Sequence, residues 1–258
     1  MFTLHNGDCL QILPSIPSGS IDAIITDLPY GTTACKWDTV IEFAPMWKEV
    51  KRVLKPNGAF ITTASQPFTS ALVMSNPKMF KYEWVWDKIV KRGHLVSKIR
   101  PLQQTEGVLI FGKGKINYFP QETKRDKPVK IKEGSKTSIM GKRGSSNYRN
   151  TRTTFLPSNL IVFSNGNDRY KIHSTQKPVA LYEYLIKTYT NEGEIVLDIA
   201  MGSGTTIEAA ERTGRNSIGI EKDEVIFQSA VLRLKSFTPS NKACSGQEPL
   251  AERLAGFE

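Results

Sequence analysis

Residues 196–210, with the sequence VLDIAMGSGTTIEAA, are compatible with few folds. An apolar β-branched run ends at Asp198, a turn of small residues containing Gly202 and Gly204 follows, and a helical pattern then begins. Glycines at such a turn let a ligand approach the backbone, and a helix N-terminus favours a negative group. A second strand-like run ends at Glu221, where a carboxylate can accept hydrogen bonds from ribose hydroxyls. The unit therefore predicts a βαβ element that binds a nucleoside.

Two phosphate-binding patterns that use a similar turn are absent from the sequence. The pattern G-x-G-x-x-G fails because Ile207 stands at its third glycine, and no G-x-x-x-x-G-K-[ST] loop occurs. A lone glycine turn also joins ordinary strands to helices. The nucleoside hypothesis therefore depends on Asp198 and Glu221 as well as on the turn.

Apolar periodicity predicts strands that alternate with helices over most of the chain. Continuous β-branched runs predict strands, and an apolar stripe along residues 41–58 predicts an amphipathic helix that the KPNG sequence stops. The predicted strands are 20–27, 59–64, 82–90, 105–113, 160–163, 194–200 and 216–221, and the predicted helices are 41–58, 178–190, 205–214 and 223–236. This alternation is typical of an α/β fold with a doubly wound, mostly parallel sheet.

The middle of the chain differs from the rest in charge. Residues 113–152 hold 12 Lys or Arg and three acidic residues, which gives +9 of the net charge of +10. From about 112 to 156 the sequence is polar and has no sustained period, which predicts an insertion or a poorly ordered excursion. The charge fits either a solvated loop or a surface for nucleic-acid phosphates, and composition alone leaves both open.

Simple counts exclude several protein classes. No run approaches the ~20 apolar residues of a membrane span. The N-terminal residues 1–15 lack the basic flank and apolar core of a signal peptide. The three cysteines, Cys9, Cys35 and Cys244, are far apart, which predicts neither a disulfide framework nor a metal site and fits a reducing cytoplasm.

Five segments, taken in order, resemble the amino-group DNA methyltransferases that use S-adenosylmethionine. DLPY at 27–30 resembles their catalytic [DNS]-P-P-[YFW] motif, and DIAMGSGTT at 198–206 resembles their cofactor turn, commonly D-P-F-x-G-S-G-T-T. The other three are NGDCLQIL at 6–13, HSTQKPVAL at 173–181 and GRNSIGIEKDEVIFQSAVLRL at 214–234. The resemblance covers about residues 4–112 and 157–235, and the ordered set is highly specific.

The order of these segments matches the β group of the family, whose Rossmann-like methyltransferase fold is circularly permuted. It implies three parts: a catalytic half at 1–112, a basic target-recognition insertion at 113–156 and a cofactor-binding half at 157–236. The residues that follow, 237–258, themselves predict a disordered tail. The residues that it implies for nucleic-acid binding are Lys124, Arg125, Lys127, Lys130, Lys132, Lys142, Arg143, Arg149 and Arg152.

The resemblance implies that the DLPY segment catalyses methyl transfer to N6 of an adenine flipped out of the duplex. Asp27 and the backbone carbonyl of Leu28 would accept the two N6–H bonds and expose the nitrogen lone pair. Pro29 completes the catalytic motif, and the ring of Tyr30 would stack on the base. The chain contains no Pro-Cys nucleophile, which argues against cytosine C5 methylation.

The resemblance also implies a cofactor site. Asp8 and Cys9 would lie near the cofactor adenine and Glu221 at its ribose, with Lys177 and the glycine turn around the methionine part. The implied set is Asp8, Cys9, Asp27, Thr175, Lys177, Asp198, Ala200, Gly202, Ser203, Gly204, Thr205 and Glu221, with no metal. A helix cap for Asp8 and a solvated side chain for Lys177 are the ordinary alternatives.

Two departures from the family pattern keep alternatives open. Leu28 replaces a proline, and Ile199 with Ala200 replaces Pro-Phe, so one alternative is a catalytically weak DNA-binding relative. The other is cytosine N4 methylation, whose enzymes mostly carry serine where this chain has Asp27. The expected partners are double-stranded DNA, a second copy of the chain and a cognate restriction endonuclease, with no membrane. The expected location is the bacterial cytoplasm, for a bacterial or a phage protein.

Overall fold

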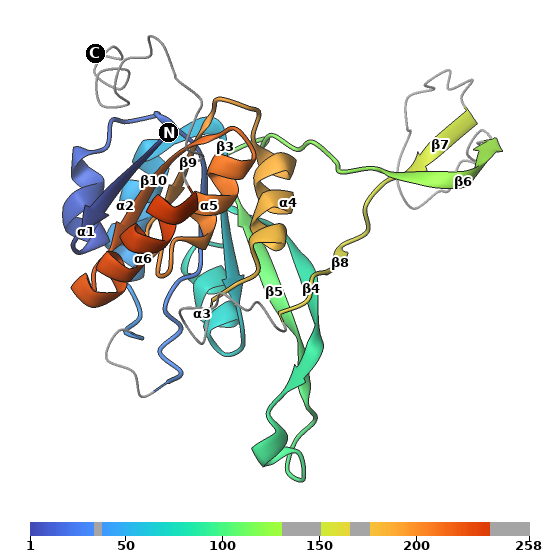
Figure 1. The fold of residues 1–258 in the computed structure, drawn as a ribbon, viewed down its shortest axis with the longest axis horizontal. Helices are drawn as coiled ribbons and strands as arrows, with labels where there is room; N and C mark the ends of the chain where they lie inside the picture. Colours follow the sequence, from blue (N-terminus) through green and yellow to red (C-terminus); the bar gives the residue numbers. More distant parts are fainter. Residues whose placement is uncertain (34–37, 131–150, 166–175, 238–258) are drawn as a thin grey trace. The chain divides into compact units, whose positions relative to one another are not determined.

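The computed structural model describes residues 1–33, 38–130, 151–165 and 176–237 (Figure 1). The chain divides into two compact units, a larger one formed by Met1–Phe119 with Asn159–Glu258 and a smaller one formed by Pro120–Ser158. The predicted tail lies outside the described residues from residue 238 onward. None of the described helices is long and apolar enough to cross a lipid bilayer.

The larger unit is built on an eight-stranded sheet with the order β1-β10-β9-β2-β3-β5-β4-β8. Its strands are β1 (Phe2–Asn6), β2 (Ile21–Thr26), β3 (Leu54–Ala64), β4 (Phe80–Arg92), β5 (Gln103–Phe111), β8 (Leu160–Val162), β9 (Ile195–Asp198) and β10 (Asn216–Glu221). Neighbouring strands are parallel, except that β5 runs antiparallel to both β3 and β4. The prediction of an α/β, mostly parallel sheet is confirmed.

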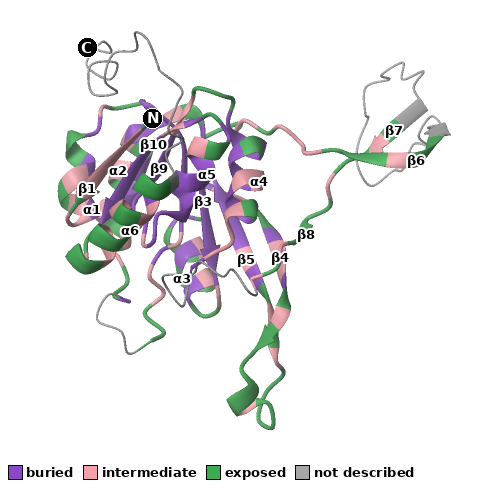
Figure 2. Cartoon of the chain, in the orientation of Figure 1, coloured by how far each residue is buried: buried purple, intermediate pink, exposed green. Residues whose placement is uncertain are grey.

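Helices cover both faces of this sheet. They are α1 (Cys9–Ile12), α2 (Phe43–Val53), α3 (Phe68–Ser75), α4 (Val179–Tyr189), α5 (Thr205–Arg212) and α6 (Glu224–Phe237), with 3-10 turns η1 (Leu13–Ser15) and η2 (His94–Val96). In β2, Ile24 packs in an apolar cluster with Met46 of α2, whereas Ile25 packs in another with Leu181 of α4. Because both faces are covered, all six residues of β2 (IDAIIT) are buried, and four of them are apolar. Figure 2 shows the middle of the sheet, at β3 and β9, as largely buried.

Helix α2 is shorter than the predicted helix at 41–58. It ends at Val53, and β3 begins at the next residue, so the KPNG sequence belongs to the strand. Pro56 has no N–H for a helical bond and disfavours helical backbone at the residue before it, which ends the helix earlier. Ile21 pairs with Leu54 and Ala23 with Ala59, so the ladder between β2 and β3 is irregular at this point.

Several elements had no strong pattern in the sequence. Periodicity predicted neither β1 nor α3, and it predicted no strand in the smaller unit, where β6 (Thr123–Lys130) pairs antiparallel with β7 (Thr151–Phe155). The sequence of β6, TKRDKPVK, lacks apolar alternation. Backbone pairing and the guanidinium of Arg125, 3.7 Å from the ring centroid of Phe155, stabilise this ribbon instead of a buried layer.

Candidate active site

Three neighbouring strands end in acidic residues at one edge of the sheet. Asp27 follows β2, Asp198 ends β9 and Glu221 ends β10. Strand β9 lies between β2 and β10 and is parallel to both, so the carboxyl ends of all three meet. The three acidic residues border a cavity of about 560 Å³, a volume within the usual range of small-molecule sites.

Most residues predicted for catalysis and cofactor binding line this cavity. They are Asp8, Cys9, Asp27, Leu28, Pro29, Tyr30, Lys177, Asp198, Ala200, Gly202, Ser203, Thr205 and Glu221. Gly204 is not in the cavity wall, because its Cα faces Leu234 of α6, whose Cδ1 would lie 3.0 Å from an added Cβ. Thr175 lies outside the described residues. Among the described residues, no group of His, Cys, Asp and Glu is arranged to hold a metal ion.

The glycine turn between β9 and α5 is hydrogen-bonded to the residue that ends β10. Gly202 has a left-handed backbone (φ 50°), and its N–H donates to Oε2 of Glu221 at 2.9 Å. The N–H of Asp223 donates to Oε1 of the same carboxylate at 2.8 Å. Burial raises the pKa of Glu221, and these backbone bonds only partly offset the shift. Each oxygen retains a second lone pair, so Glu221 can still accept hydrogen bonds from a ligand.

Asp198 is buried below the same turn. Its carboxylate accepts hydrogen bonds from the N–H of Ala200 and from the hydroxyl of Thr206, which joins the end of β9 to helix α5. Loss of solvation raises the pKa of Asp198 to about 7, although both hydrogen bonds act to lower it. Asp198 therefore shapes the turn and can hold a proton near neutral pH.

Asp8 caps α1 and also lines the cavity. Its Oδ1 accepts a hydrogen bond from the N–H of Leu10 at 2.9 Å, and its Oδ2 lies 2.9 Å from Nζ of Lys222. The capping role that was the ordinary alternative is therefore present. The neighbouring thiol of Cys9 is buried, and burial together with the charge of Asp8 raises the pKa of Cys9 to about 11. Cys9 is thus a neutral wall residue.

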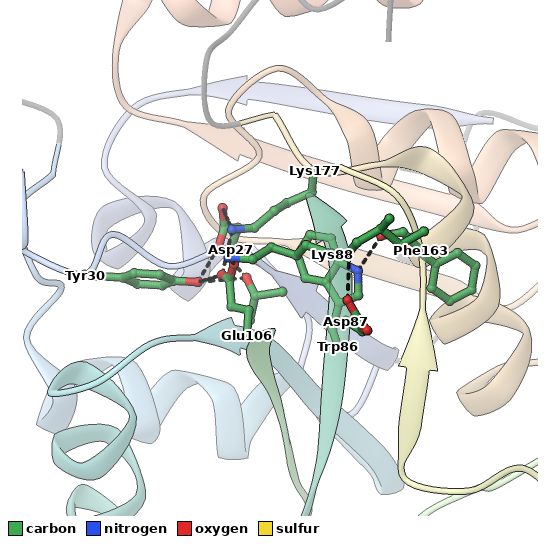
Figure 3. Close-up of polar contacts among 10 residues, drawn as sticks. Asp27, Tyr30, Trp86, Asp87, Lys88, Glu106, Phe163 and Lys177 are labelled. Carbon is green, nitrogen blue, oxygen red and sulfur yellow. Dashed lines mark hydrogen bonds and ion pairs between the residues drawn. The ribbon is translucent and has the colours of Figure 1, made fainter. Parts of the chain in front are cut away.

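Asp27 lies in a cluster of polar side chains from five segments of the chain (Figure 3). Its Oδ1 accepts a hydrogen bond from the hydroxyl of Thr63 in β3, and its Oδ2 lies 3.1 Å from Nζ of Lys177. The Tyr30 hydroxyl lies 2.9 Å from Oδ1 of Asp27 and 2.8 Å from Oε1 of Glu106. A phenol has one proton to donate, so Tyr30 serves one of these two carboxylates at a time.

Glu106, in β5, is the second carboxylate of this cluster. Its Oε1 lies 2.9 Å from Nζ of Lys177 and its Oε2 lies 3.3 Å from Nζ of Lys88. Burial acts to raise the pKa of Glu106, but the charges of Lys177 and Lys88 outweigh it and lower the pKa. Burial likewise acts to lower the pKa of Lys177, but Asp27 and Glu106 raise it. The cluster therefore holds two buried cations against two carboxylates.

Sequence reasoning missed Glu106, Lys88 and Thr63. The available signal was weak: Glu106 and Lys88 are charged residues, and only the structure shows that their positions in β5 and β4 are buried. A buried charge is costly unless it is paired, so each predicts a partner without identifying it.

Asp38 was also missed, and it fixes the backbone directly after the DLPY segment. Its carboxylate accepts hydrogen bonds from the backbone N–H groups of Gly31 at 2.8 Å, Thr32 at 2.9 Å and Thr33 at 2.7 Å. Burial opposes this arrangement, but the hydrogen bonds lower the pKa of Asp38. Asp38 therefore holds the backbone of residues 31–33 in place beside the cavity, whose wall includes Thr32, Thr33 and Asp38 itself.

The side chains of Tyr30 and Leu28 pack within the larger unit. The ring of Tyr30 stacks on Phe68, with a centroid distance of 5.1 Å and an interplanar angle of 24°, so Phe68 covers part of this ring. Leu28, which replaces the usual proline, is 3% exposed and packs in the same apolar cluster as Cys9 and Phe68. The leucine side chain is therefore accommodated in the core.

The predicted basic residues lie in the smaller unit. Lys124 and Lys127 are exposed on β6, whereas Arg125 is half-buried and its Nε donates to the carbonyl of Thr154 at 2.9 Å. Lys130 is the last residue of β6, and Arg152 lies in β7. The remaining predicted residues, Lys132, Lys142, Arg143 and Arg149, lie outside the described residues.

Comparisons with known proteins agree with this geometry. A family model described as DNA methylase matches residues 21–232. The type II methyltransferase M.HpaI of Haemophilus parainfluenzae is 30% identical over 246 residues, which cover 89% of this chain and 73% of M.HpaI. The DNA adenine methyltransferase YhdJ of Escherichia coli strain K12 is 30% identical over 256 residues, which cover 90% of this chain and 82% of YhdJ.

Solved structures share the fold. The M1.HpyAVI–SAM complex superposes with a TM-score of 0.62 at 27% identity, covering 91% of this chain and 99% of the other. The cytosine-N4-specific PvuII DNA methyltransferase superposes with a TM-score of 0.65 at 20% identity, covering 99% of this chain and 90% of the other. At that identity the second likeness concerns the fold alone.

Proposed function

The chain belongs to the DNA methylase family, and from this membership we propose that it transfers a methyl group from S-adenosylmethionine to N6 of a flipped-out adenine in double-stranded DNA. The observation that carries the proposal is one cavity that brings together Asp27 of the DLPY segment, the glycine turn and Glu221. This places a hydrogen-bond acceptor for an amino group beside acceptors and backbone suited to a nucleoside.

The residues of the cavity fit the cofactor. S-adenosylmethionine, when bound, supplies an electrophilic methyl group on a sulfonium. We assign the ribose hydroxyls to Glu221, whose oxygens each retain a lone pair, and the adenine end to the wall formed by Asp8 and Cys9. The turn at Gly202 and Ser203 and the side chain of Lys177 lie in the same wall and are assigned to the methionine part.

Asp27 is the proposed acceptor for one N6–H of the target adenine, and the carbonyl of Leu28 is the proposed acceptor for the other. An aryl amine is a poor nucleophile because its lone pair is delocalised into the ring. Two acceptors fixed in place favour a tetrahedral nitrogen and stabilise the positive charge that develops on it. Thr63, Tyr30 and Lys177 hold the carboxylate of Asp27 in position, so it needs little reorganisation during the reaction.

Specificity and partners extend this proposal. Asp27 favours adenine over cytosine N4, because cytosine N4 enzymes mostly carry serine at this position. We assign contacts with the DNA target to the basic smaller unit, through Lys124 and Lys127 among its exposed cations. We further propose that the chain forms a homodimer, that it has a cognate restriction endonuclease as its partner, and that it acts in the bacterial cytoplasm.

The test is the identity of the methylated nucleoside. The full chain is incubated with S-adenosylmethionine and mixed-sequence duplex DNA, and the DNA is digested to nucleosides and analysed by mass spectrometry. N6-methyldeoxyadenosine is the expected product. Formation of N4-methyldeoxycytidine would show instead that the enzyme methylates N4 of cytosine. Absence of any methylated nucleoside, with salt-sensitive DNA binding intact, would mean that the protein acts by binding alone.

A further inference from the structure

Beyond the sheet, residues 89–102 form an arm that comprises the last residues of β4, the turn η2 and the segment that leads back to β5 at Gln103 (Figure 1). Strand β4 is antiparallel to β5, which is antiparallel to β3, so β4 points the same way as β2 and β3. The arm therefore leaves the sheet at the edge where Asp27 lies. Lys88, at the base of the arm, forms an ion pair with Glu106 in the polar cluster around Asp27.

The base of the arm is fixed by specific contacts. Trp86 is fully buried, and its Nε1 donates to the carbonyl of Phe163 at 2.8 Å (Figure 3). The Asp87 carboxylate accepts hydrogen bonds from Gln104 Nε2 at 2.9 Å and from the N–H of Ile89 at 2.7 Å. Ile89 has a left-handed backbone (φ 63°), which is costly for a β-branched residue and coincides with a register shift between β4 and β5. The arm thus departs from the sheet at a defined bend.

The arm carries positive charge and no negative charge. Its cations are Lys91, Arg92, Lys98 and Arg100, all exposed, and residues 89–102 include no acidic residue. None of the ion pairs found among the described residues involves these four side chains. An isolated cationic ribbon at the catalytic edge is complementary to a polyanion.

The tip of the arm adds apolar side chains that the fold leaves uncovered. Leu95 is 102% exposed and Ile99 is 85% exposed. The N–H of Ile99 donates to the carbonyl of Val96 at 2.9 Å in the turn that carries them. Figure 2 shows this end of the arm mostly in the colour of exposed residues. Apolar side chains flanked by Lys and Arg are the combination that proteins use in DNA grooves, where the cations meet phosphates.

We propose that this arm binds the substrate DNA beside the target base, with Lys98 and Arg100 on phosphates and Leu95 and Ile99 in a groove. The inference rests on the proposed function only for the identity of the polyanion. It adds a DNA contact from the larger unit to the contacts proposed for the basic smaller unit.

The test compares the native chain with the double variant Lys98→Gln/Arg100→Gln by fluorescence anisotropy on a 30-base-pair mixed-sequence duplex between 50 and 300 mM NaCl. The slope of log affinity against log salt is expected to become shallower by about 2, since each phosphate contact contributes about 0.9. Affinity at 100 mM NaCl is expected to fall about tenfold or more. The control is Lys48→Gln/Lys51→Gln, which removes the same charge from exposed positions on α2, a helix that ends at the opposite edge of the sheet.

A second variant, Leu95→Ser/Ile99→Ser, is expected to weaken DNA binding without changing the salt slope. An unchanged affinity and slope in the Lys98/Arg100 variant, equal to those of the α2 control, would overturn the proposal. So would dissociation of a native dimer by Leu95→Ser/Ile99→Ser with DNA binding unaltered, because the arm would then be a protein interface. Binding is measured without cofactor, so absence of methylated product from the native chain would contradict the proposed function and leave this result standing.

Discussion

Lys177 and Glu106 are joined by an ion pair of 2.9 Å between Nζ and Oε1, although 71 residues separate them in the chain. The same ammonium lies 3.1 Å from Oδ2 of Asp27. The ammonium of Lys177 thus joins the carboxylate of the DLPY segment to a carboxylate on β5. This ion pairing explains how the carboxylates of Asp27 and Glu106 can both lie within hydrogen-bonding distance of the Tyr30 hydroxyl.

Lys177→Met is expected to lower the free energy of unfolding by about 3 kcal/mol, because it leaves the buried Glu106 carboxylate and the half-buried Asp27 carboxylate without their shared cation. Urea denaturation followed by circular dichroism measures this. The matched control is Lys222→Met, which breaks an ion pair of similar length with Asp8 but at a lysine that is 76% exposed, and is expected to cost less than about 1 kcal/mol. Equal losses in the two variants would contradict the structural role of Lys177.

Glu106→Gln is expected to lower kcat about tenfold while KM for S-adenosylmethionine changes little. Glu106 acts through Lys177 and Tyr30, which position Asp27, and it does not line the cavity itself. Steady-state methyl transfer to DNA gives both constants. Glu83→Gln, at an exposed glutamate of β4, is the control and is expected to leave both unchanged. An equal loss in kcat for both variants would contradict the role of Glu106 in positioning Asp27.

The sequence was sufficient to predict what depends on local pattern. The strand–turn–helix unit from Val196, the acids at the ends of β9 and β10 and the DLPY segment were all read from contiguous residues, and the structure brings them to one cavity. Pairings between distant residues left no such pattern, so Glu106 and Lys88 were found only in the structure. Strand β6 was missed because backbone pairing stabilises its polar sequence without an apolar stripe.

Asp198→Asn is expected to change how stability depends on pH. Because the folded pKa of Asp198 is raised to about 7, the folded protein keeps this proton between pH 4 and 7 while the unfolded chain releases it. Native stability therefore falls with rising pH relative to the variant, by up to about 1.4 kcal/mol per pH unit, and the difference levels off above the folded pKa. Denaturation midpoints at pH 5, 6, 7 and 8 provide the measurement.

Asp38→Asn supplies the control for this pH effect, because the pKa of Asp38 is lowered by the N–H groups of its loop despite its burial. Asp38 contributes stability above its unfolded pKa, and this contribution is lost as pH falls through its lower folded pKa. At neutral pH the native chain is expected to be more stable than this variant. A difference between native and Asp198→Asn that stays constant across the range would refute the assignment for Asp198.

The two glycines of the cofactor turn are expected to respond differently to alanine. Gly202 has a positive φ and open space around an added Cβ, but it lines the cavity, so Gly202→Ala should chiefly weaken cofactor binding. Gly204 also has a positive φ, and an added Cβ would lie 3.0 Å from Leu234, so Gly204→Ala should cost more stability, about 2 kcal/mol. Calorimetric titration with S-adenosylmethionine and urea denaturation separate the two effects. Equal cofactor affinities in the two variants would contradict the placement of Gly202 at the ligand.

The central claim, that Asp27 is the acceptor for the amino group, is tested most directly by the single-turnover rate of methyl transfer in Asp27→Ala. The variant is first shown to bind S-adenosylmethionine and duplex DNA, and the rate is then measured with both saturating. The expected rate is lower than the native rate by about 100-fold or more, the usual cost of removing a preorganised electrostatic partner. A rate within tenfold of the native value, with both ligands bound, would contradict the role of Asp27 and the mechanism built on it.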